Sequence, residues 1–135
     1  MHQELNISLA RNLLAALQEG RPPEEIAALF SEDVLFEIPG DDGVLPWIGH
    51  RSGRPAVDAF ITATRAMTDL LTFDIEDIAA SEARAIIVGE LASRIRKTDK
   101  VVETAFAIIL TISEDRIVRF QMLEDSFAVS LAGRA

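Results

Sequence analysis

Three side chains of this sequence have types that could move a proton at neutral pH. Glu124 and Asp125 follow the last apolar run, and His50 lies in a loop rich in Gly and Pro that also holds the chain's single Trp, Trp47. An imidazole titrates near neutrality, and a carboxyl does so when its surroundings withhold water. Such groups serve as general acids and bases, so these three are the candidate catalytic residues.

Each candidate also has a structural alternative. Glu124 is either a desolvated carboxyl or a solvated carboxylate at a strand end. Asp125 is either a base or the N-cap of a short helix within DSFAVSLAG. His50 either folds over a pocket or is exposed, and Trp47 either plugs the core or lines the mouth of a pocket. Neighbouring strand residues point to opposite faces, so Glu124 and Asp125 do not form a carboxylate dyad.

The other polar residues show no pattern for binding a metal or a phosphate. The absence of Cys excludes a thiolate zinc site, a disulfide and a cysteine nucleophile. His2 and His50 lack the spacing of zinc ligands, and GDDG lacks the further ligands of a calcium loop. No glycine-rich phosphate loop is present. We therefore expect no cofactor.

The charge of the chain limits its partners. Thirteen basic residues stand against 22 acidic ones, which gives a net charge of -9. Nucleic acids and anionic membranes both require a basic surface, so neither is an expected partner. The longest apolar run, AFAIIL, is too short to span a bilayer, and the N-terminus lacks a secretory signature. We expect a soluble, cytoplasmic protein.

Hydrophobic periodicity predicts helices in the first half and strands in the second. Leucines every four residues favour a helix over 5–18, and two further helices are expected at 23–30 and 52–67. Alternating patterns predict a strand at 33–39 and then an antiparallel meander. The meander strands are expected at 73–79, 83–96, 101–112 and 117–125. This order indicates an α+β fold with the helices on one face of a curved sheet.

The alternation along the long strands predicts two different sheet faces. Small residues would leave space on one side, namely Gly89, Ser93, Ala105 and Ala107. We expect this side, with Glu103 near its end, to enclose a cavity. The opposite side is too apolar to face water, because it presents Phe106, Ile108 and Leu110. Either a second copy of the chain covers it, or both faces are packed as ordinary core.

Three segments carry a resemblance to a known family. ALFSEDVLFEIP, WIGHRSGRPAVDAFI and SEDRIVRFQMLEDSFAV occur in the family's order and at matching distances. The chain resembles the nuclear-transport-factor-2-like (NTF2-like) superfamily, and within it the SnoaL-like polyketide cyclases and relatives of ketosteroid isomerase. The resemblance implies one domain over 1–135. Its fold would be a cone-shaped α+β barrel with three N-terminal helices on a curved, mostly antiparallel sheet, an apolar pocket and a dimer through the sheet.

The residues of two well-known activities in this superfamily are missing. The acids of ketosteroid isomerase would fall at Ile38 and about Ala107, and its Tyr near Leu13 or Leu14, whereas this chain has no Tyr. The Arg and two Asp of limonene epoxide hydrolase would fall at about Gly89, Leu91 and Met122. Neither mechanism is therefore expected.

The resemblance implies that the side of the last strand with Glu124 faces the pocket. The expected catalytic residues are Glu124, Asp125 and His50. The expected substrate-binding residues are Phe36, Ile38, Trp47, Leu91, Ala107, Phe120 and Met122.

We expect a SnoaL-like enzyme that performs cofactor-free acid/base isomerisation, cyclisation or dehydration of a small hydrophobic carbonyl compound. The alternative is a non-catalytic ligand-binding or dimerisation module of the same fold. In either case the expected partners are a small hydrophobic molecule and a second copy, bound through the outer sheet face. Polar groups converging on an enclosed cavity would favour the enzyme, and a filled cone would favour the module.

Overall fold

A computed structural model describes residues 2–135 of the chain. Helices and strands occur in the order that the periodicity predicts, with one short strand added and with the terminal helix that DSFAVSLAG offered as an alternative. The elements are α1 (His2–Gln18), α2 (Pro23–Ala27), β1 (Phe30–Ile38), β2 (Gly49–Ser52), α3 (Arg54–Met67), β3 (Thr68–Ala80), β4 (Arg84–Ile95), β5 (Lys100–Ser113), β6 (Arg116–Glu124) and α4 (Ser126–Gly133).

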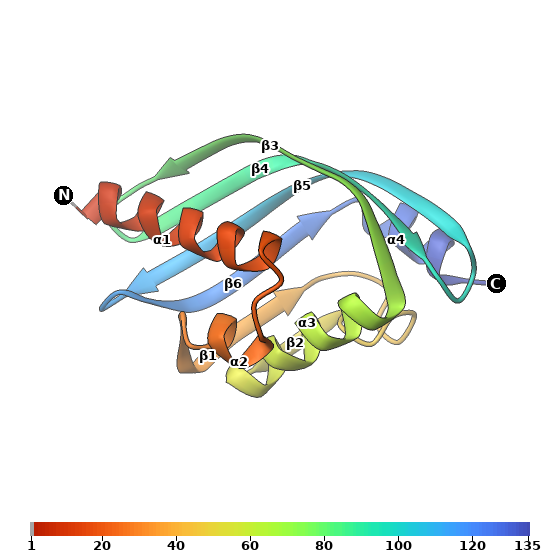
Figure 1. Cartoon of the computed structure of the whole chain (residues 1–135), viewed down its shortest axis with the longest axis horizontal. Coiled ribbons are helices and arrows are strands. Elements are labelled where there is room, and N and C mark those ends of the chain that lie inside the picture. The colour runs from red at the N-terminus through yellow and green to blue at the C-terminus, as the bar shows by residue number, and fades with distance from the viewer. Residues whose placement is uncertain (1) are drawn as a thin grey trace.

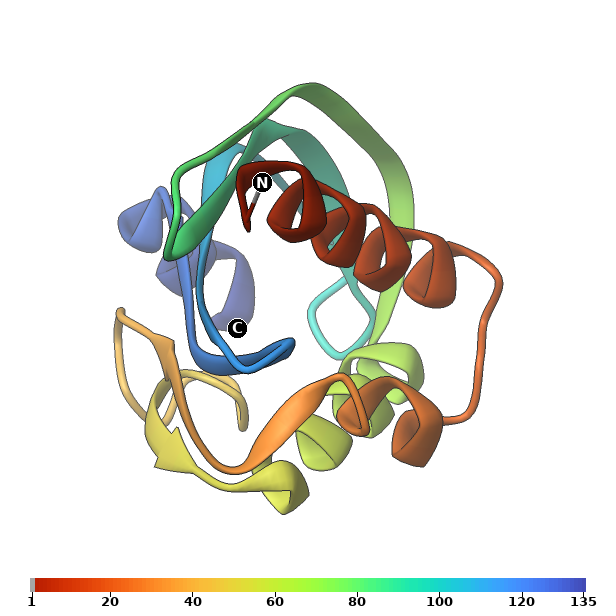
Figure 2. The same ribbon diagram turned by 90° about the vertical axis from the view of Figure 1, so that its left-hand side faces the viewer.

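The six strands form one curved sheet in the order β2-β1-β6-β5-β4-β3. All neighbouring pairs are antiparallel except β1 and β6, which are parallel. Figure 1 shows α1 lying along the sheet, and Figure 2 shows α1 inside the curve while α2 and α3 close the open side. The sheet is curved but does not close on itself. Together, the helices and the curved sheet form the expected α+β cone, which is therefore confirmed.

Helix α1 buries most of the predicted leucine column, because Leu13 is buried and Leu9 and Leu17 pack against the core, but the stripe is shifted at its N-terminal end. Leu5 is 54% exposed, whereas Asn6, Ala10 and Leu13 are buried. The Asn6 amide nitrogen donates hydrogen bonds to the backbone oxygens of Ser81 and Glu82, at 3.0 and 3.2 Å. A buried amide must be paired, so these two bonds attach α1 to the turn between β3 and β4.

Two boundaries differ from the predicted ones. Strand β2 lies where only a loop was expected, because Gly49–Ser52 pairs with the end of β1. The N-cap of α3 is Gly53, with φ of 88°, rather than Ser52, and no side chain caps it. A positive φ is easily adopted by glycine, which explains the residue at this turn. Pro55 lies in the first turn, as predicted.

The predicted faces were right for β4 and wrong for β5. Gly89, Leu91 and Ser93 face the helices as expected, but so does the row of β5 that contains Phe106, Ile108 and Leu110. The alternation of side chains along a strand shows which residues share a face, but it does not show which face of the sheet points towards the helices. The larger side chains lie inside because burying them removes more apolar area from water. Ala105, Ala107 and Glu103 therefore lie on the outer face.

Gly89 is required by the close approach of β3 rather than by a ligand. A Cβ at Gly89 would lie 2.1 Å from the Asp74 backbone oxygen and 3.0 Å from the Phe106 ring. Beside it the rings of Phe73 and Phe106 stack with their centroids 5.1 Å apart. The small residue thus makes room for an aromatic pair across the sheet.

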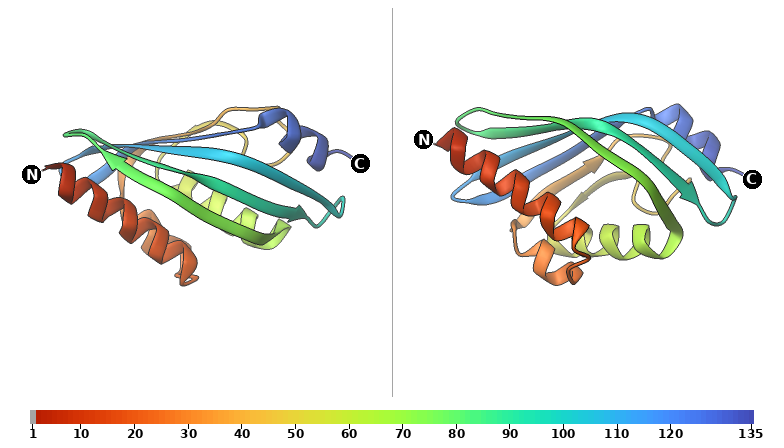
Figure 3. Two further views of the ribbon diagram at one scale, coloured as in Figure 1. Left: turned by 90° about the horizontal axis from the view of Figure 1, so that it is seen from above. Right: turned by 45° about the horizontal axis from the view of Figure 1, so that its top comes forward.

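The C-terminal helix α4 lies beside the end of the sheet, next to the turn between β4 and β5 (Figure 3). Thr98 in that turn donates its hydroxyl to the Ala132 oxygen at 2.6 Å. Lys100 donates its ammonium group to the Arg134 oxygen at 2.7 Å, which satisfies a carbonyl at the helix end. Among residues 2–135, no helix is long and apolar enough to cross a membrane.

Candidate functional site

Aromatic rings fill much of the interior of the cone. Phe36 and Phe120 stack with centroids 4.5 Å apart and an interplanar angle of 4°. Phe60 lies 5.2 Å from Phe36, and Phe30 lies 6.1 Å from Phe120. Phe36 and Phe120 occupy paired positions on the parallel strands β1 and β6, so the sheet itself brings these rings together. The deep hollow expected at this position is thus occupied by side chains.

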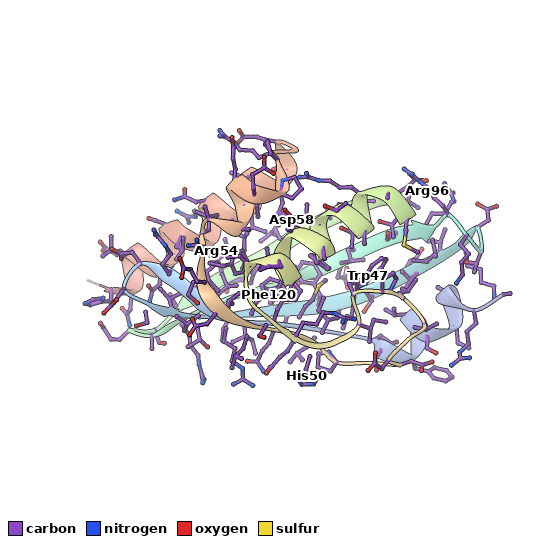
Figure 4. The ribbon with its side chains drawn as sticks, turned by 90° about the horizontal axis from the view of Figure 1, so that it is seen from below. Trp47, His50, Arg54, Asp58, Arg96 and Phe120 are labelled. Carbon is purple, nitrogen blue, oxygen red and sulfur yellow. The ribbon has the colours of Figure 1, made fainter. Side chains whose placement is uncertain are left out.

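A smaller pocket remains between α3 and the loop that carries Trp47. Its volume is about 140 Å³. Trp47 is only 9% exposed, and its ring meets Phe60 edge-on at 6.5 Å. Figure 4 shows Trp47 between the loop and α3. The indole therefore both packs against the core and lines a pocket. The complete lining is Phe36, Pro46, Trp47, Arg51, Ala56, Ala59, Phe60 and Ala63.

Arg51 holds the Trp47 loop in place. Its guanidinium Nη2 donates to the backbone oxygens of Pro46 and Ile48, the latter at 3.2 Å. These two carbonyls flank Trp47 on either side. One arginine from β2 therefore fixes the backbone that positions the indole, while its own side chain forms part of the pocket wall.

The start of the same loop is fixed by α4. The Asp41 carboxylate accepts a hydrogen bond from the Ser130 hydroxyl at 2.6 Å and pairs with Arg134. The bond from Ser130 and then the contact with Arg134 hold the pKa of Asp41 below its usual value. The Trp47 loop is thus attached at both ends, to α4 and to β2.

Glu124 ends the inner row of β6. Phe120 and Met122 precede it on the same face, and Phe106 lies opposite it on β5. Within residues 2–135, no side chain donates a hydrogen bond or forms an ion pair with its carboxyl. Burial raises the pKa of Glu124 from 4.5 to about 7. This position agrees with the desolvated alternative rather than with a solvated carboxylate.

Asp125 adopts the capping role that the sequence offered as an alternative. Its carboxylate accepts a hydrogen bond from the Ala128 backbone nitrogen at 3.0 Å and begins α4. Its own backbone nitrogen donates to the hydroxyl of buried Thr104 at 2.8 Å. Asp125 and Glu124 are adjacent in sequence, but only Glu124 lies in the inner row.

His50 lies on the outer side of the sheet, apart from Glu124. Its side chain is 71% exposed, and Nδ1 lies 3.7 Å from Glu37 Oε1. Glu37 also accepts three hydrogen bonds from Arg119 on β6, at 2.9, 3.1 and 3.2 Å. The exposed alternative is therefore the one that the structure shows, and Figure 4 places His50 away from Trp47.

The expected binding residues fall into three groups. Phe36 and Trp47 line the pocket. Ala107 lies on the outer sheet face, so its predicted position was wrong, because alternation alone could not orient β5. The others lie inside but outside the pocket lining, namely Ile38, Leu91, Phe120 and Met122.

Sequence reasoning missed several residues of the pocket wall. Phe60 could have been found from the apolar stripe of α3, whose next turns also supply the lining alanines. No pattern in the sequence points to Arg51, because its role depends on β2 lying beside the Trp47 loop. Among residues 2–135, no group of three or more acidic or histidine side chains is placed to hold a metal ion.

Solved structures similar to this one share the fold over nearly the whole chain. An NTF2-like protein from Burkholderia xenovorans LB400 has a TM-score of 0.87 at 20% identity and covers 98% of each chain. A protein from Rhodopseudomonas palustris named "putative isomerase" has a TM-score of 0.75 at 20% identity and covers 93% of each. One from Xanthomonas campestris pv. campestris named "putative polyketide cyclase" has a TM-score of 0.80 at 13% identity and covers 99% and 100%.

Sequence comparison identifies the family. No curated protein matches the chain. The family model described as SnoaL-like domain matches residues 10–120, which extend from α1 to Phe120 in the aromatic cluster. Together with the cone of helices and curved sheet, this match shows that the chain belongs to the SnoaL-like domain family of the NTF2-like superfamily.

Proposed function

We propose that this SnoaL-like protein catalyses a cofactor-free acid/base reaction on a small hydrophobic carbonyl compound, with Glu124 as the proton carrier. The observation that carries the proposal is the Glu124 carboxyl, which lies unpaired in an apolar inner row with its pKa raised to about 7. Two structural neighbours with names that include isomerase and polyketide cyclase are compatible with this class of reaction.

A carboxyl with this pKa suits proton transfer at neutral pH. Both its protonated and ionised forms are populated there, so it can accept a proton from a carbon next to a carbonyl and return it elsewhere. Isomerisation, aldol-type cyclisation and dehydration all need such a step. The apolar surroundings that raise the pKa also exclude the water that would compete for the proton.

The pocket at Trp47 limits the size of the substrate. A cavity of about 150 Å³ is known to hold benzene in an engineered protein, and the pocket here is about 140 Å³. We therefore infer a substrate with one ring against Trp47 and Phe36. Glu124 lies four residues beyond Phe120, or ~13 Å along the strand, with Met122 between them. Met122 is unbranched and flexible, so it can move aside for a substrate that reaches the carboxyl.

Proton exchange tests the proposal without the natural substrate. 6-Phenyl-2-hexanone, whose chain can extend from a ring at Trp47 towards Glu124, should gain deuterium next to its carbonyl in D2O faster with the protein than in buffer alone, with a rate that rises through pH 7. Glu124→Gln should abolish the excess rate, whereas Asp125→Asn and His50→Ala should retain it. An undiminished rate in the Glu124 variant would refute the role of this carboxyl.

A non-catalytic binding module is the second candidate. The observation that favours it is the filled interior, in which Phe36, Phe60 and Phe120 occupy most of the cone. In that case 6-phenyl-2-hexanone would shift the fluorescence of Trp47 and yet show no exchange above buffer in any variant. The same pair of measurements therefore separates the two functions.

We also propose a homodimer through the outer sheet face. This face is apolar but its residues differ from the expected ones, since Ile86 and Leu123 are 37% and 42% exposed and Ala107 and Ile109 lie between them. Arginines and Glu90 on the same face could pair across a twofold axis. Ile109→Asp should convert a dimer to a monomer in light scattering, and Glu82→Lys on a distant turn should not. A monomeric parent protein would refute the dimer.

A further inference from the structure

A groove on the outside of the helical layer is separate from the Glu124 row. It is an open, shallow groove between α2 and the first half of α3, with a volume of about 430 Å³. Ala59 lines both this groove and the Trp47 pocket, so α3 separates the two. Figure 4 shows Arg54 and Asp58 on this stretch of α3. The lining consists of Glu24, Ala27, Arg54, Pro55, Asp58 and Ala59.

Arg54 is the charged group of the groove that the structure holds in place. Its Nε donates to the Phe30 backbone oxygen at 2.9 Å, and the side chain is half-buried. Within residues 2–135, it forms no ion pair, and its two terminal nitrogens donate no hydrogen bond. A guanidinium fixed through Nε presents its free nitrogens as a fork, which matches the two oxygens of a carboxylate.

Two carboxylates line the same groove without a cation. Neither Glu24 nor Asp58 forms an ion pair within the described chain. Asp58 accepts only the Thr62 hydroxyl, at 3.3 Å. The groove therefore combines one free cation with two free anions, above an apolar floor of Ala27, Pro55 and Ala59. Because the cation and the carboxylates of the groove do not pair with each other, they are available to a ligand that carries both a negative and a positive group.

The direction of α3 orients such a ligand. The helix begins at Arg54, and its first turn contains no acidic residue. The positive end of the helix dipole thus adds to the Arg54 charge and attracts the carboxylate of the ligand. Asp58 lies one turn further along the same helix, where an ammonium group would meet it.

We propose that this groove binds a small zwitterion with a carboxylate on Arg54, an ammonium group against Asp58 and Glu24, and a short apolar body between them. The site is independent of the proposed proton transfer, because none of its charged residues lies in the Glu124 row. It gives the protein a second small-molecule site on the outside of the cone.

A titration of the full chain with 6-aminohexanoate tests the proposal. In ¹H–¹⁵N NMR spectra, the amides of Ala27, Arg54 and Asp58 should shift and saturate. Hexanoate and hexylamine, which each carry one of the two charges, should bind at least about tenfold more weakly, because each forgoes one charge-assisted contact. Absence of saturable shifts, or equal binding of either single-charge analogue, would overturn the proposal.

Variants assign the effect to the groove. Arg54→Gln and Asp58→Asn should each weaken 6-aminohexanoate at least about tenfold, while Arg65→Gln further along α3 and Glu124→Gln should leave it unchanged. Asp58→Asn preserves the bond between Arg54 and Phe30, so it remains informative if Arg54→Gln does not fold. Binding that persists in Asp58→Asn with unchanged affinity would refute the assigned pose.

Discussion

Glu124 lies directly opposite Phe106 across the ladder between β5 and β6. A carboxyl therefore shares its row with a phenyl ring instead of a cation, and Met122 and Phe120 extend this apolar row along β6. Nothing in the row compensates for the loss of hydration when Glu124 ionises. The same geometry that raises its pKa also couples the charge of this residue to the stability of the fold.

Glu124 should make the protein less stable as the pH rises towards neutrality. Its pKa is 4.5 ordinarily and about 7 in the folded state, so between these values the native state holds more protons than the unfolded state. Its stabilising contribution is full below pH 4.5 and is lost as the pH rises through 7. At pH 8, Glu124→Gln should be more stable than the parent by about 3 kcal/mol, and at pH 4 equally stable.

Urea unfolding at both pH values measures this difference. Glu82→Gln is the matched control, because this glutamate is exposed on the turn between β3 and β4 and its variant should show the same pH dependence as the parent. If Glu124→Gln followed the parent curve from pH 4 to pH 8, the carboxyl would have to be hydrated in the folded state.

Arg51→Ala should loosen the loop over the pocket. It removes the donor to the Pro46 and Ile48 carbonyls that flank Trp47. Because Trp47 is the chain's single Trp, its fluorescence reports on this loop alone. We expect emission shifted to longer wavelength and stronger quenching by acrylamide. Arg11→Ala, an exposed change on α1, is the control, and equal quenching in the two variants would contradict the role of Arg51.

Most helices and strands could be predicted from the sequence because the sequence signals for them are local. Leucine periodicity, a Pro in the first turn of α3 and alternating strands do not depend on distant contacts, and these elements were confirmed. Strand β2 and buried Asn6 were missed for the opposite reason. Four residues pair only because β1 lies beside them, and the partners of Asn6 are more than seventy residues away.

Gly89→Ala should destabilise the protein by roughly 1–3 kcal/mol, as overpacking does. The added methyl would lie 2.1 Å from the Asp74 oxygen and would also press on the Phe106 ring. Gly20→Ala is the comparison, because this glycine has a positive φ of 68° but open space around it. Thermal unfolding should show the larger loss of stability for Gly89→Ala. Equal losses in the two variants would indicate that β3 can move away from residue 89 at little energetic cost.

Asp125→Ala should cost about 1 kcal/mol of stability through the loss of the N-cap of α4. The proposed exchange activity should remain, since Glu124 carries the proton. Asp125→Ser, which can still cap the helix, should restore most of the stability in urea unfolding. Complete loss of proton exchange in a folded Asp125→Ser variant would show that the Asp125 carboxylate itself takes part in proton transfer.

The site was predicted less completely than the fold. Glu124 and the Asp125 cap could be foreseen, because strand alternation and capping preferences are local rules. The position of Ala107 was wrong because alternation does not say which face of β5 is inside. The size of the pocket could not be foreseen either, since it depends on how the rings of Phe36, Phe60 and Phe120 share the interior.

The parallel pair of β1 and β6 also bears on how the chain is made. Phe36 finds its partner Phe120 only after α3 and the strands β3 to β5 have been synthesised, whereas β3 to β6 can pair with sequential neighbours. Closing so long a loop is slow compared with forming hairpins. On the ribosome the edge of β1 that pairs with β6 must therefore stay soluble until β6 emerges, and Glu32, Asp33 and Glu37 supply β1 with charges that oppose aggregation.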